Sequence, residues 1–104
     1  MLVSYQDVND WGAGFVGQMV ITNNTNKAIT NWTLAFNFTP TVTNIWSAQI
    51  ATHSGTRYAL QNLSYNGVLN PGDQVTFGFQ GAPGGKLLPT NGSFNGANVT
   101  IGWP

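Results

Sequence analysis

The sequence contains few side chains that could do acid–base or nucleophilic chemistry. Its only acids are Asp7, Asp10 and Asp73, its only histidine is His53, and it has no Cys. Hydrolysis of a glycoside usually needs two carboxylates held at a set separation. Asp73 falls in a Pro-Gly turn, and Asp7 and Asp10 flank a Gly-rich turn, so turn capping is their expected role. His53 has no acidic neighbour in sequence and is expected to be a solvated loop residue. The sequence therefore predicts no catalytic residue, no metal site and no cofactor.

Aromatic rings outside the predicted core are the second source of chemistry. The chain has four Trp, three Tyr and six Phe. Trp11 lies in a Gly-rich turn at residues 9–14, where few neighbours could bury it. An exposed ring is favoured there over one folded back across the end of the fold. Trp46 directly follows Ile45, and adjacent residues of a strand face opposite sides. If Ile45 faces the core, Trp46 is exposed.

The other rings share the phase of apolar residues along the chain. Trp32 alternates in step with its apolar neighbours and is predicted to be buried. The same argument places five phenylalanines in the core: Phe15, Phe36, Phe38, Phe77 and Phe79. Trp103 is in phase with Ile101 and is expected in the core or at a sheet edge. Tyr65 is in phase with Leu63, so its exposure would require a bulge or an early turn.

Exposed planar rings in a weakly charged protein suit sugars. Each sugar ring has an apolar face of C–H groups and a polar rim of hydroxyls. An indole can stack on the C–H face, and amides beside it, which both donate and accept hydrogen bonds, can serve the rim. One ring holds weakly, so a polysaccharide requires two or three rings in a line. For such a line we expect roughly micromolar affinity.

Composition limits the classes of partner. Only 6% of residues are charged and the formal net charge is zero. The basic patch of a nucleic-acid binder and the basic face of a membrane-surface binder are both missing. No apolar run approaches the roughly 20 residues that cross a bilayer, and the first five residues do not have the form of a signal peptide. A surface of amides and hydroxyls predicts a neutral, hydroxyl-rich partner, with no nucleic acid and no membrane.

The elements that would position the rings are β-strands. Period-2 alternation is frequent, no long window has helical periodicity, and turn residues separate the runs. Seven to nine short strands predict an all-β fold, an antiparallel β-sandwich of jelly-roll or immunoglobulin-like type. Residues 1–104 are expected to form one domain, with a long loop at 81–92 before the last strand. The predicted strands cover residues 3–8, 15–22, 32–38, 42–50, 57–61, 63–68, 75–80 and 97–103.

Several segments together resemble the family 2 carbohydrate-binding modules, the bacterial cellulose-binding domains attached to cellulases, xylanases and chitinases. The resemblance implies a sandwich of about nine strands with three coplanar surface rings, which here are Trp11, Trp46 and Tyr65. It also implies polar flanking residues, which here are Asn9, Gln18, Asn44 and Gln80. The segments that carry it, in the family's order and spacing, are residues 11–15, 31–36, 43–48, 64–67, 69–72 and 77–81.

The resemblance further implies a non-catalytic module of a secreted protein, which directs an attached catalytic domain to insoluble polysaccharide. In the cellulose-type branch of the family, a Gly stands three residues after the first exposed Trp. The xylan-type branch has an Arg there, which holds the indole upright. Gly14 occupies this position here, so Trp11 can lie flat. A flat platform suits a crystalline surface. The most favoured ligand is therefore cellulose, followed by chitin, as for the binding module of a chitinase, and xylan is less favoured than both.

Two departures from the family pattern accompany the resemblance. The family usually joins its two ends by a disulfide, and this chain has no Cys. Tyr65 also stands where Trp is usual, and the smaller ring is expected to stack less. One alternative function stays open: the chain could be a structural or protein-interaction β-sandwich without a glycan ligand. In that case Trp11 and Trp46 would be buried or would contact a protein.

Overall fold

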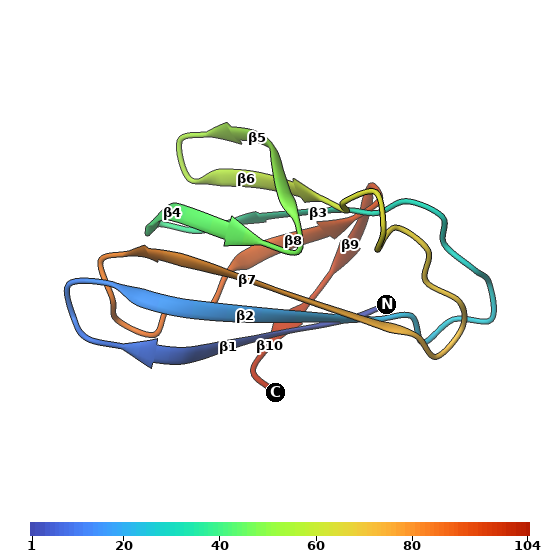
Figure 1. Cartoon of the computed structure of the whole chain (residues 1–104), viewed down its shortest axis with the longest axis horizontal. Coiled ribbons are helices and arrows are strands. Elements are labelled where there is room, and N and C mark those ends of the chain that lie inside the picture. The colour runs from blue at the N-terminus through green and yellow to red at the C-terminus, as the bar shows by residue number, and fades with distance from the viewer.

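The computed structural model describes residues 1–104, which form two β-sheets packed face to face (Figure 1). The first sheet has the strand order β10-β1-β2-β7-β4 and the second β5-β6-β3-β8-β9. All strand pairs are antiparallel except β1 and β10, which are parallel. The structure has no helix that is long and apolar enough to cross a membrane. The strands are β1 Leu2–Asp10, β2 Phe15–Thr22, β3 Thr33–Asn37, β4 Thr41–Trp46, β5 Gln49–Ser54, β6 Arg57–Gln61, β7 Gln74–Ala82, β8 Thr90–Phe94, β9 Ala97–Val99 and β10 Ile101–Gly102.

The core lies between the two sheets and is largely aromatic. Burial alternates strictly along β2, as the sequence predicts for a strand with one face inward. Trp32, which directly precedes β3, is buried and stacks on Phe77 of β7, with ring centroids 5.6 Å apart. The prediction that Trp32 and the five phenylalanines are core residues is confirmed, as is the prediction of a β-sandwich.

Two β-bulges decide which residues reach the outer face of the first sheet. In β1, Asp7 pairs with Gly17 but Asn9 already pairs with Val16, so Val8 is the extra residue. The shift turns Asn9 outward, although it has the phase of the buried Val3. A bulge of this kind re-aims every later side chain of its strand.

A second bulge, in β4 at the other edge of the first sheet, also changes which side chains face outward. Val42 pairs with Gly81 and Asn44 with Gln80, so Thr43 is the extra residue. Because of it, Val42 and Ile45 both pack against the core, although they are three residues apart. Trp46 consequently faces outward, as predicted from its place after Ile45.

Several predicted strands differ from the structure. The run 42–50 divides into β4 and β5 at Ser47, whose positive φ of 63° redirects the chain from the first sheet to the second. The predicted strand at 63–68 is wrong, because these residues form a turn between β6 and β7. The run 97–103 divides into β9 and β10, which belong to different sheets. The predicted loop at 81–92 is shorter, since β7 extends to Ala82 and β8 begins at Thr90.

The two ends of the chain are joined without a disulfide. Val3 of β1 pairs with Ile101 of β10, and both side chains are buried. Met1 and Val99 also pack against the core. Strand pairing and apolar packing therefore hold together the ends that the resemblance would join covalently.

Candidate functional site

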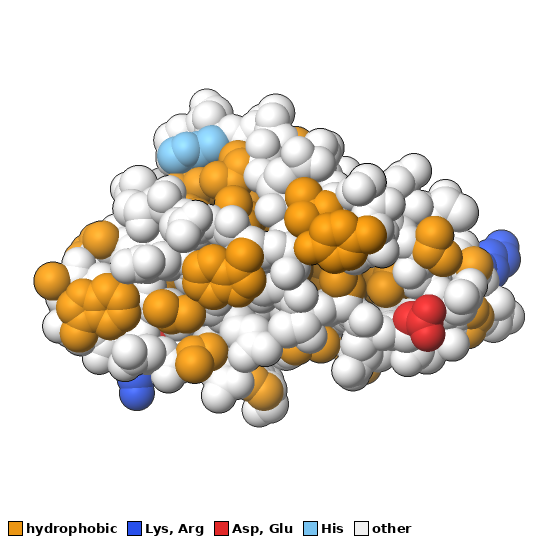
Figure 2. All heavy atoms as spheres, viewed as in Figure 1, with side chains coloured by type: hydrophobic (Ala, Val, Ile, Leu, Met, Phe, Trp, Pro, Cys, Tyr) orange, Lys and Arg blue, Asp and Glu red, His pale blue; other side chains and the backbone are white.

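The outer face of the first sheet carries most of the residues singled out in the sequence. We call this surface, together with the turn at residues 10–14 and the turn at residues 62–67, the platform face. Figure 2 shows separate hydrophobic patches along the long axis of the molecule, over the β1–β2 hairpin, over β4 and β7, and near the end of β6. The charged side chains in this view lie near the two ends. Strand register arranges the face in two transverse rows, Gln6–Gln18–Gly78–Trp46 and Asn9–Val16–Gln80–Asn44.

Trp11 lies in the turn between β1 and β2 and is 50% exposed. The turn is closed by the Trp11 N–H, which donates to the Gly14 carbonyl at 3.1 Å. The indole lies against Gly14, where a Cβ would come within 2.7 Å of Trp11 Cζ2. The missing side chain at residue 14 therefore allows one face of the ring to rest on the backbone while the other faces solvent, as expected from Gly14 in the sequence.

Trp46 rests on a glycine in the same way. It ends β4, is 42% exposed, and its ring covers its register partner Gly78 of β7. A Cβ at Gly78 would lie 2.6 Å from Trp46 Nε1. A Cβ at Gly14, beneath Trp11, would lie 3.1 Å from the carbonyl of Gly81, which is three residues further along β7 than Gly78. Three residues of strand span about 10 Å, so the glycine positions under the two indoles are offset along β7 by about the length of a disaccharide in a β-1,4-linked chain.

Tyr65 is the most exposed of the three predicted rings, at 72%. The early turn that its exposure would require is present, since the Asn66 N–H donates to the Leu63 carbonyl at 3.4 Å. The Asn66 side chain holds this turn in place, because it accepts from the Leu63 N–H at 2.8 Å and donates to the Ser47 carbonyl at 2.6 Å. Ser47 follows Trp46, so this bond fixes the Tyr65 turn beside the second ring.

Buried Trp32 and Asn62 also support the Tyr65 turn. Trp32 Nε1 donates to the Asn66 carbonyl at 3.0 Å, and Asn62 Oδ1 accepts from the Trp32 N–H at 2.9 Å. Asn62 Nδ2 in turn donates to the Leu63 carbonyl at 2.9 Å. The core tryptophan and two neutral amides therefore anchor the turn.

The four predicted polar flanking residues all lie on the platform face. Asn9, Asn44 and Gln80 are exposed and Gln18 is half-buried. Asn44 Oδ1 accepts from the Ile45 N–H at 3.0 Å. The other three side-chain amides make no hydrogen bond within the protein, so they are free to bind an external partner.

Asp10 fastens the Trp11 turn to the loop between β7 and β8. Its Oδ1 accepts from the Gly12 N–H at 2.9 Å, the turn cap that the sequence predicts. Its Oδ2 accepts from the Gly85 N–H at 2.7 Å and the Lys86 N–H at 3.3 Å. These backbone donors, led by Gly85, hold the pKa of the Asp10 carboxyl below its usual range. The bonds to Gly85 and Lys86 join residues far apart in sequence, and no local signal could have predicted them.

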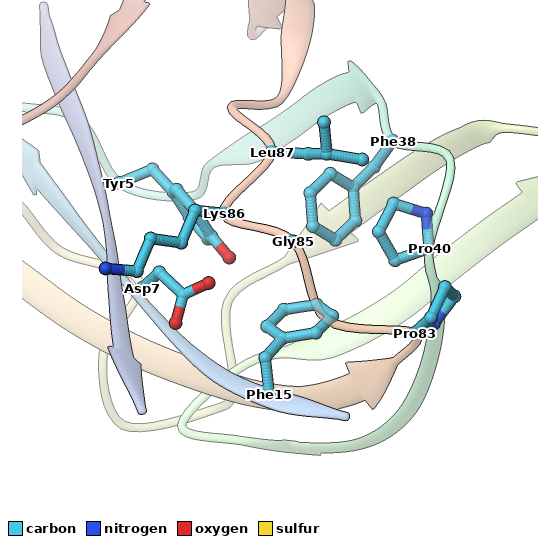
Figure 3. A pocket seen from close by; sticks show the side chains of 9 residues that line it. All are labelled: Tyr5, Asp7, Phe15, Phe38, Pro40, Pro83, Gly85, Lys86 and Leu87. Carbon is cyan, nitrogen blue, oxygen red and sulfur yellow. The ribbon is translucent and has the colours of Figure 1, made fainter. Parts of the chain in front are cut away.

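Asp7 lies beneath the same loop in a contrasting environment. Figure 3 shows its carboxyl among Tyr5, Phe15 and Lys86. Both Asp7 oxygens and the Tyr5 hydroxyl are buried without a protein hydrogen-bond partner. Burial raises the pKa of Asp7, assisted by the adjacent Asp10 carboxylate and opposed by the Lys86 charge. Burial likewise raises the pKa of Tyr5. The pKa values of these two neighbouring carboxyls are thus shifted in opposite directions, that of Asp7 upward and that of Asp10 downward.

The remaining candidate residues have structural contacts. Asp73 Oδ2 accepts from the Asn70 N–H at 2.9 Å, the predicted turn role. His53 is exposed as predicted but lies in β5, where it stacks on Tyr58 with ring centroids 3.9 Å apart. Trp103 lies beyond β10, at the edge of the first sheet opposite β4, where it packs beside Tyr5 and is 51% exposed. No group of three metal-ligating side chains comes together.

Comparisons with known proteins agree with the fold. The family model described as "Cellulose binding domain" matches residues 1–99. Endoglucanase C of Cellvibrio japonicus is 36% identical over 94% of this chain, and Chitinase C of Streptomyces lividans is 36% identical over 91%. The match spans only 13% and 15% of those two proteins.

The solved structure of an isolated domain is similar to this chain over nearly its whole length. The chitin-binding domain of Chi18aC from Streptomyces coelicolor superposes with a TM-score of 0.75 and 33% identity, covering 96% of this chain and 92% of that domain. The chain therefore belongs to the cellulose binding domain family, the family 2 carbohydrate-binding modules, which are non-catalytic domains.

Proposed function

We propose that residues 1–104 act as a single module that binds the flat face of a crystalline β-1,4-linked polysaccharide. Trp11, Trp46 and Tyr65 form the stacking surface, and the flanking amides of Asn9, Gln18, Asn44 and Gln80 bond to sugar hydroxyls. The observation that carries the proposal is the support of the two indoles. Each lies with one face on a glycine, Gly14 or Gly78, and presents the other face to solvent.

The energetics favour several weak stacks over one strong contact. Full burial of an aromatic side chain is worth roughly 2–3 kcal/mol at about 25 cal/mol/Å², and a stacked sugar covers only the exposed face. Two or three stacks, less the cost of association, give roughly micromolar affinity. The amides add orientation more than strength, since each bond replaces one to water for a net of about 0.5–1.5 kcal/mol.

Cellulose and chitin are the two candidate polymers, because both present the C–H faces of flat β-1,4-linked sugar rings. The rings alone suit either polymer. The relatives support both, since one is an endoglucanase, another a chitinase, and a third is named a chitin-binding domain. Xylan is disfavoured because Gly14 stands at the position where an Arg would hold the Trp11 indole upright. Since the chain matches a small part of those enzymes, we propose that it belongs to a larger secreted protein with an attached catalytic domain.

The alternative of a structural spacer without a glycan ligand has less support. It requires Trp11 and Trp46 to be buried or covered by a protein, and both are about half exposed on a face with free amides. Exposed rings on a face whose central rows carry only neutral side chains are better suited to a neutral ligand.

A pull-down on microcrystalline cellulose, chitin and insoluble xylan tests the proposal. Wild type, Trp11→Ala and Trp46→Ala are compared at low and high salt, with Trp103→Ala as a matched control for an exposed tryptophan at the opposite sheet edge. We expect wild type and Trp103→Ala to sediment with cellulose or chitin at both salt concentrations, because neutral stacking is not screened. The two platform variants should stay in solution while remaining folded.

The opposite pattern would overturn the proposal. Wild-type protein that stays in the supernatant with all three polymers would do so. Equal binding by wild type, Trp11→Ala and Trp46→Ala would also do so, because the rings would then have no part in adsorption.

A further inference from the structure

A depression of about 400 Å³ adjoins Trp46 on the platform face. Residues from β1, β2, β4 and β7 contribute to its wall, among them Val8, Val16, Gln18, Trp46 and Thr76. Val8 is the extra residue of the β1 bulge and is 52% exposed. Val8 has the outward phase of Ser4 and Gln6, and its apolar side chain was not singled out from the sequence as part of the site.

The depression combines apolar and hydrogen-bonding groups in a specific way. Val8 and Val16 supply methyl groups at one side, whereas Gln18 supplies an amide and Thr76 a hydroxyl. Neither the Gln18 amide nor the Thr76 hydroxyl makes a hydrogen bond within the protein. An amide has both a donor and an acceptor, and a hydroxyl can take either role. A matching ligand group would be a small planar amide that carries a methyl.

We propose that this depression is a subsite for the 2-acetamido group of chitin, and that it makes the module prefer chitin over cellulose. The proposal rests on the platform function above and names the ligand of the same face. The acetamido methyl packs on Val8 and Val16, and its N–H donates to Gln18 Oε1.

Cellulose cannot use the subsite in this way. Its C2 hydroxyl is a single atom, which leaves the valine methyls in contact with water. Consecutive sugars of a β-1,4-linked chain are turned over relative to each other, so alternate acetamido groups point to the same side. One subsite beside Trp46 therefore receives one acetamido group from each disaccharide. Burial of one methyl and one additional hydrogen bond correspond to about tenfold in affinity.

Binding isotherms on chitin, cellulose and chitosan, the deacetylated form of chitin, test the subsite. The variant is the double substitution Val8→Ser with Val16→Ser, which removes both methyl contacts without touching the three rings. The matched control is Leu2→Ser with Val20→Ser, two outward-facing apolar residues of the same strands, β1 and β2, toward the far end of the sheet. We expect wild type and control to bind chitin about tenfold more tightly than cellulose or chitosan. The Val8/Val16 variant should lose that preference and keep its cellulose affinity.

A second measurement needs no variant. In NMR spectra of wild-type protein with chitohexaose, we expect nuclear Overhauser effects between the acetamido methyl and the methyls of Val8 and Val16. Equal wild-type affinity for chitin and chitosan, or an undiminished chitin preference in the variant, would overturn the subsite while leaving the platform in place. A failure of wild type to bind any of the polymers would overturn the platform as well.

Discussion

The turns that carry Trp11 and Tyr65 are anchored by different chemistry. The Trp11 turn is fastened by a carboxylate, since Asp10 accepts three backbone N–H bonds and thereby joins the turn to the β7–β8 loop. The Tyr65 turn is fastened by neutral groups, the amides of Asn62 and Asn66 and the indole N–H of Trp32. One ring therefore depends on an ionised side chain and the other does not.

The two turns also differ in how they connect to Trp46. Asn66 bonds directly to Ser47, so a displaced Tyr65 turn also disturbs the residue after Trp46. The Trp11 turn makes no hydrogen bond to Trp46 or Ser47, and its Gly14 lies beside Gly81 of β7 rather than beside Gly78 under Trp46. Tyr65 and Trp46 should therefore respond together to a perturbation, and Trp11 should respond separately.

Removal of the Asn66 amide should have the largest effect. Asn66→Ala deletes two short hydrogen bonds and leaves the Leu63 N–H and the Ser47 carbonyl without these partners. We expect a loss of about 2–3 kcal/mol in the free energy of unfolding, measured by urea denaturation. Asn9→Ala is the control, because Asn9 is exposed and without a protein partner, and it should change stability by less than about 0.5 kcal/mol. Equal stability of the two variants would show that Asn66 does not anchor the turn.

A methyl group beneath the Trp11 ring should affect binding more than folding. In Gly14→Ala the new Cβ would lie 2.7 Å from the indole, so the ring must tilt away from the backbone. We expect about a tenfold loss of affinity for the crystalline polymer, with an unfolding midpoint close to that of wild type. Gly102→Ala is the control, since a Cβ there meets nothing within 4 Å. If Gly14→Ala binds as wild type does, the resting position of the indole has no importance for adsorption.

Acid should distinguish the two turns. The pKa of Asp10 is lowered, so its stabilising contribution is present above the usual Asp range and is lost as the pH falls through its folded-state pKa. The pKa of Asp7 is raised, so its contribution is complete at low pH and is lost as the pH rises through its folded-state pKa. We expect Asp10→Asn to lower the melting temperature at about pH 7 and Asp7→Asn to raise it.

Both differences should shrink in strong acid, where the wild-type carboxyls are neutral as well. Calorimetry of the three proteins between about pH 7 and pH 2 measures this, because the lowered pKa of Asp10 requires an acid end below its usual range. Asp7 and Asp10 variants that shift the melting temperature in the same direction at neutral pH would contradict the opposite pKa shifts.

Enlargement of the third ring should have the smallest effect. Tyr65→Trp adds stacking area at a side chain that is already mostly exposed, so stability should not change. We expect a gain of a few-fold in affinity for the crystalline polymer, seen in adsorption isotherms. Unchanged affinity, with the platform otherwise active, would show that Tyr65 does not stack on the ligand.

The sequence predicted the sandwich and its core because burial alternates with period 2, and it placed Trp46 correctly because the neighbouring Ile45 packs against the core. The sequence wrongly predicted a strand at 63–68, because Leu63 and Tyr65 are spaced as apolar residues are in a strand. The long-range hydrogen bonds that hold this segment as a turn join it to Trp32 and Ser47. The bulges at Val8 and Thr43 also have no local signal, since register arises only from pairing with β2 and β7. Asn9 was therefore placed only through the resemblance, whereas Val8 has the outward phase of Gln6 but was not singled out.

The most direct test of the central claim uses the four indole N–H signals in a ¹⁵N-HSQC spectrum. The protein is titrated with cellohexaose and, separately, with chitohexaose. If Trp11 and Trp46 lie on the binding face, their indole signals should shift with the ligand. The edge residue Trp103 should give a signal that stays in place. Shifts confined to Trp103, or no shift of Trp11 and Trp46 with either oligosaccharide, would contradict the account.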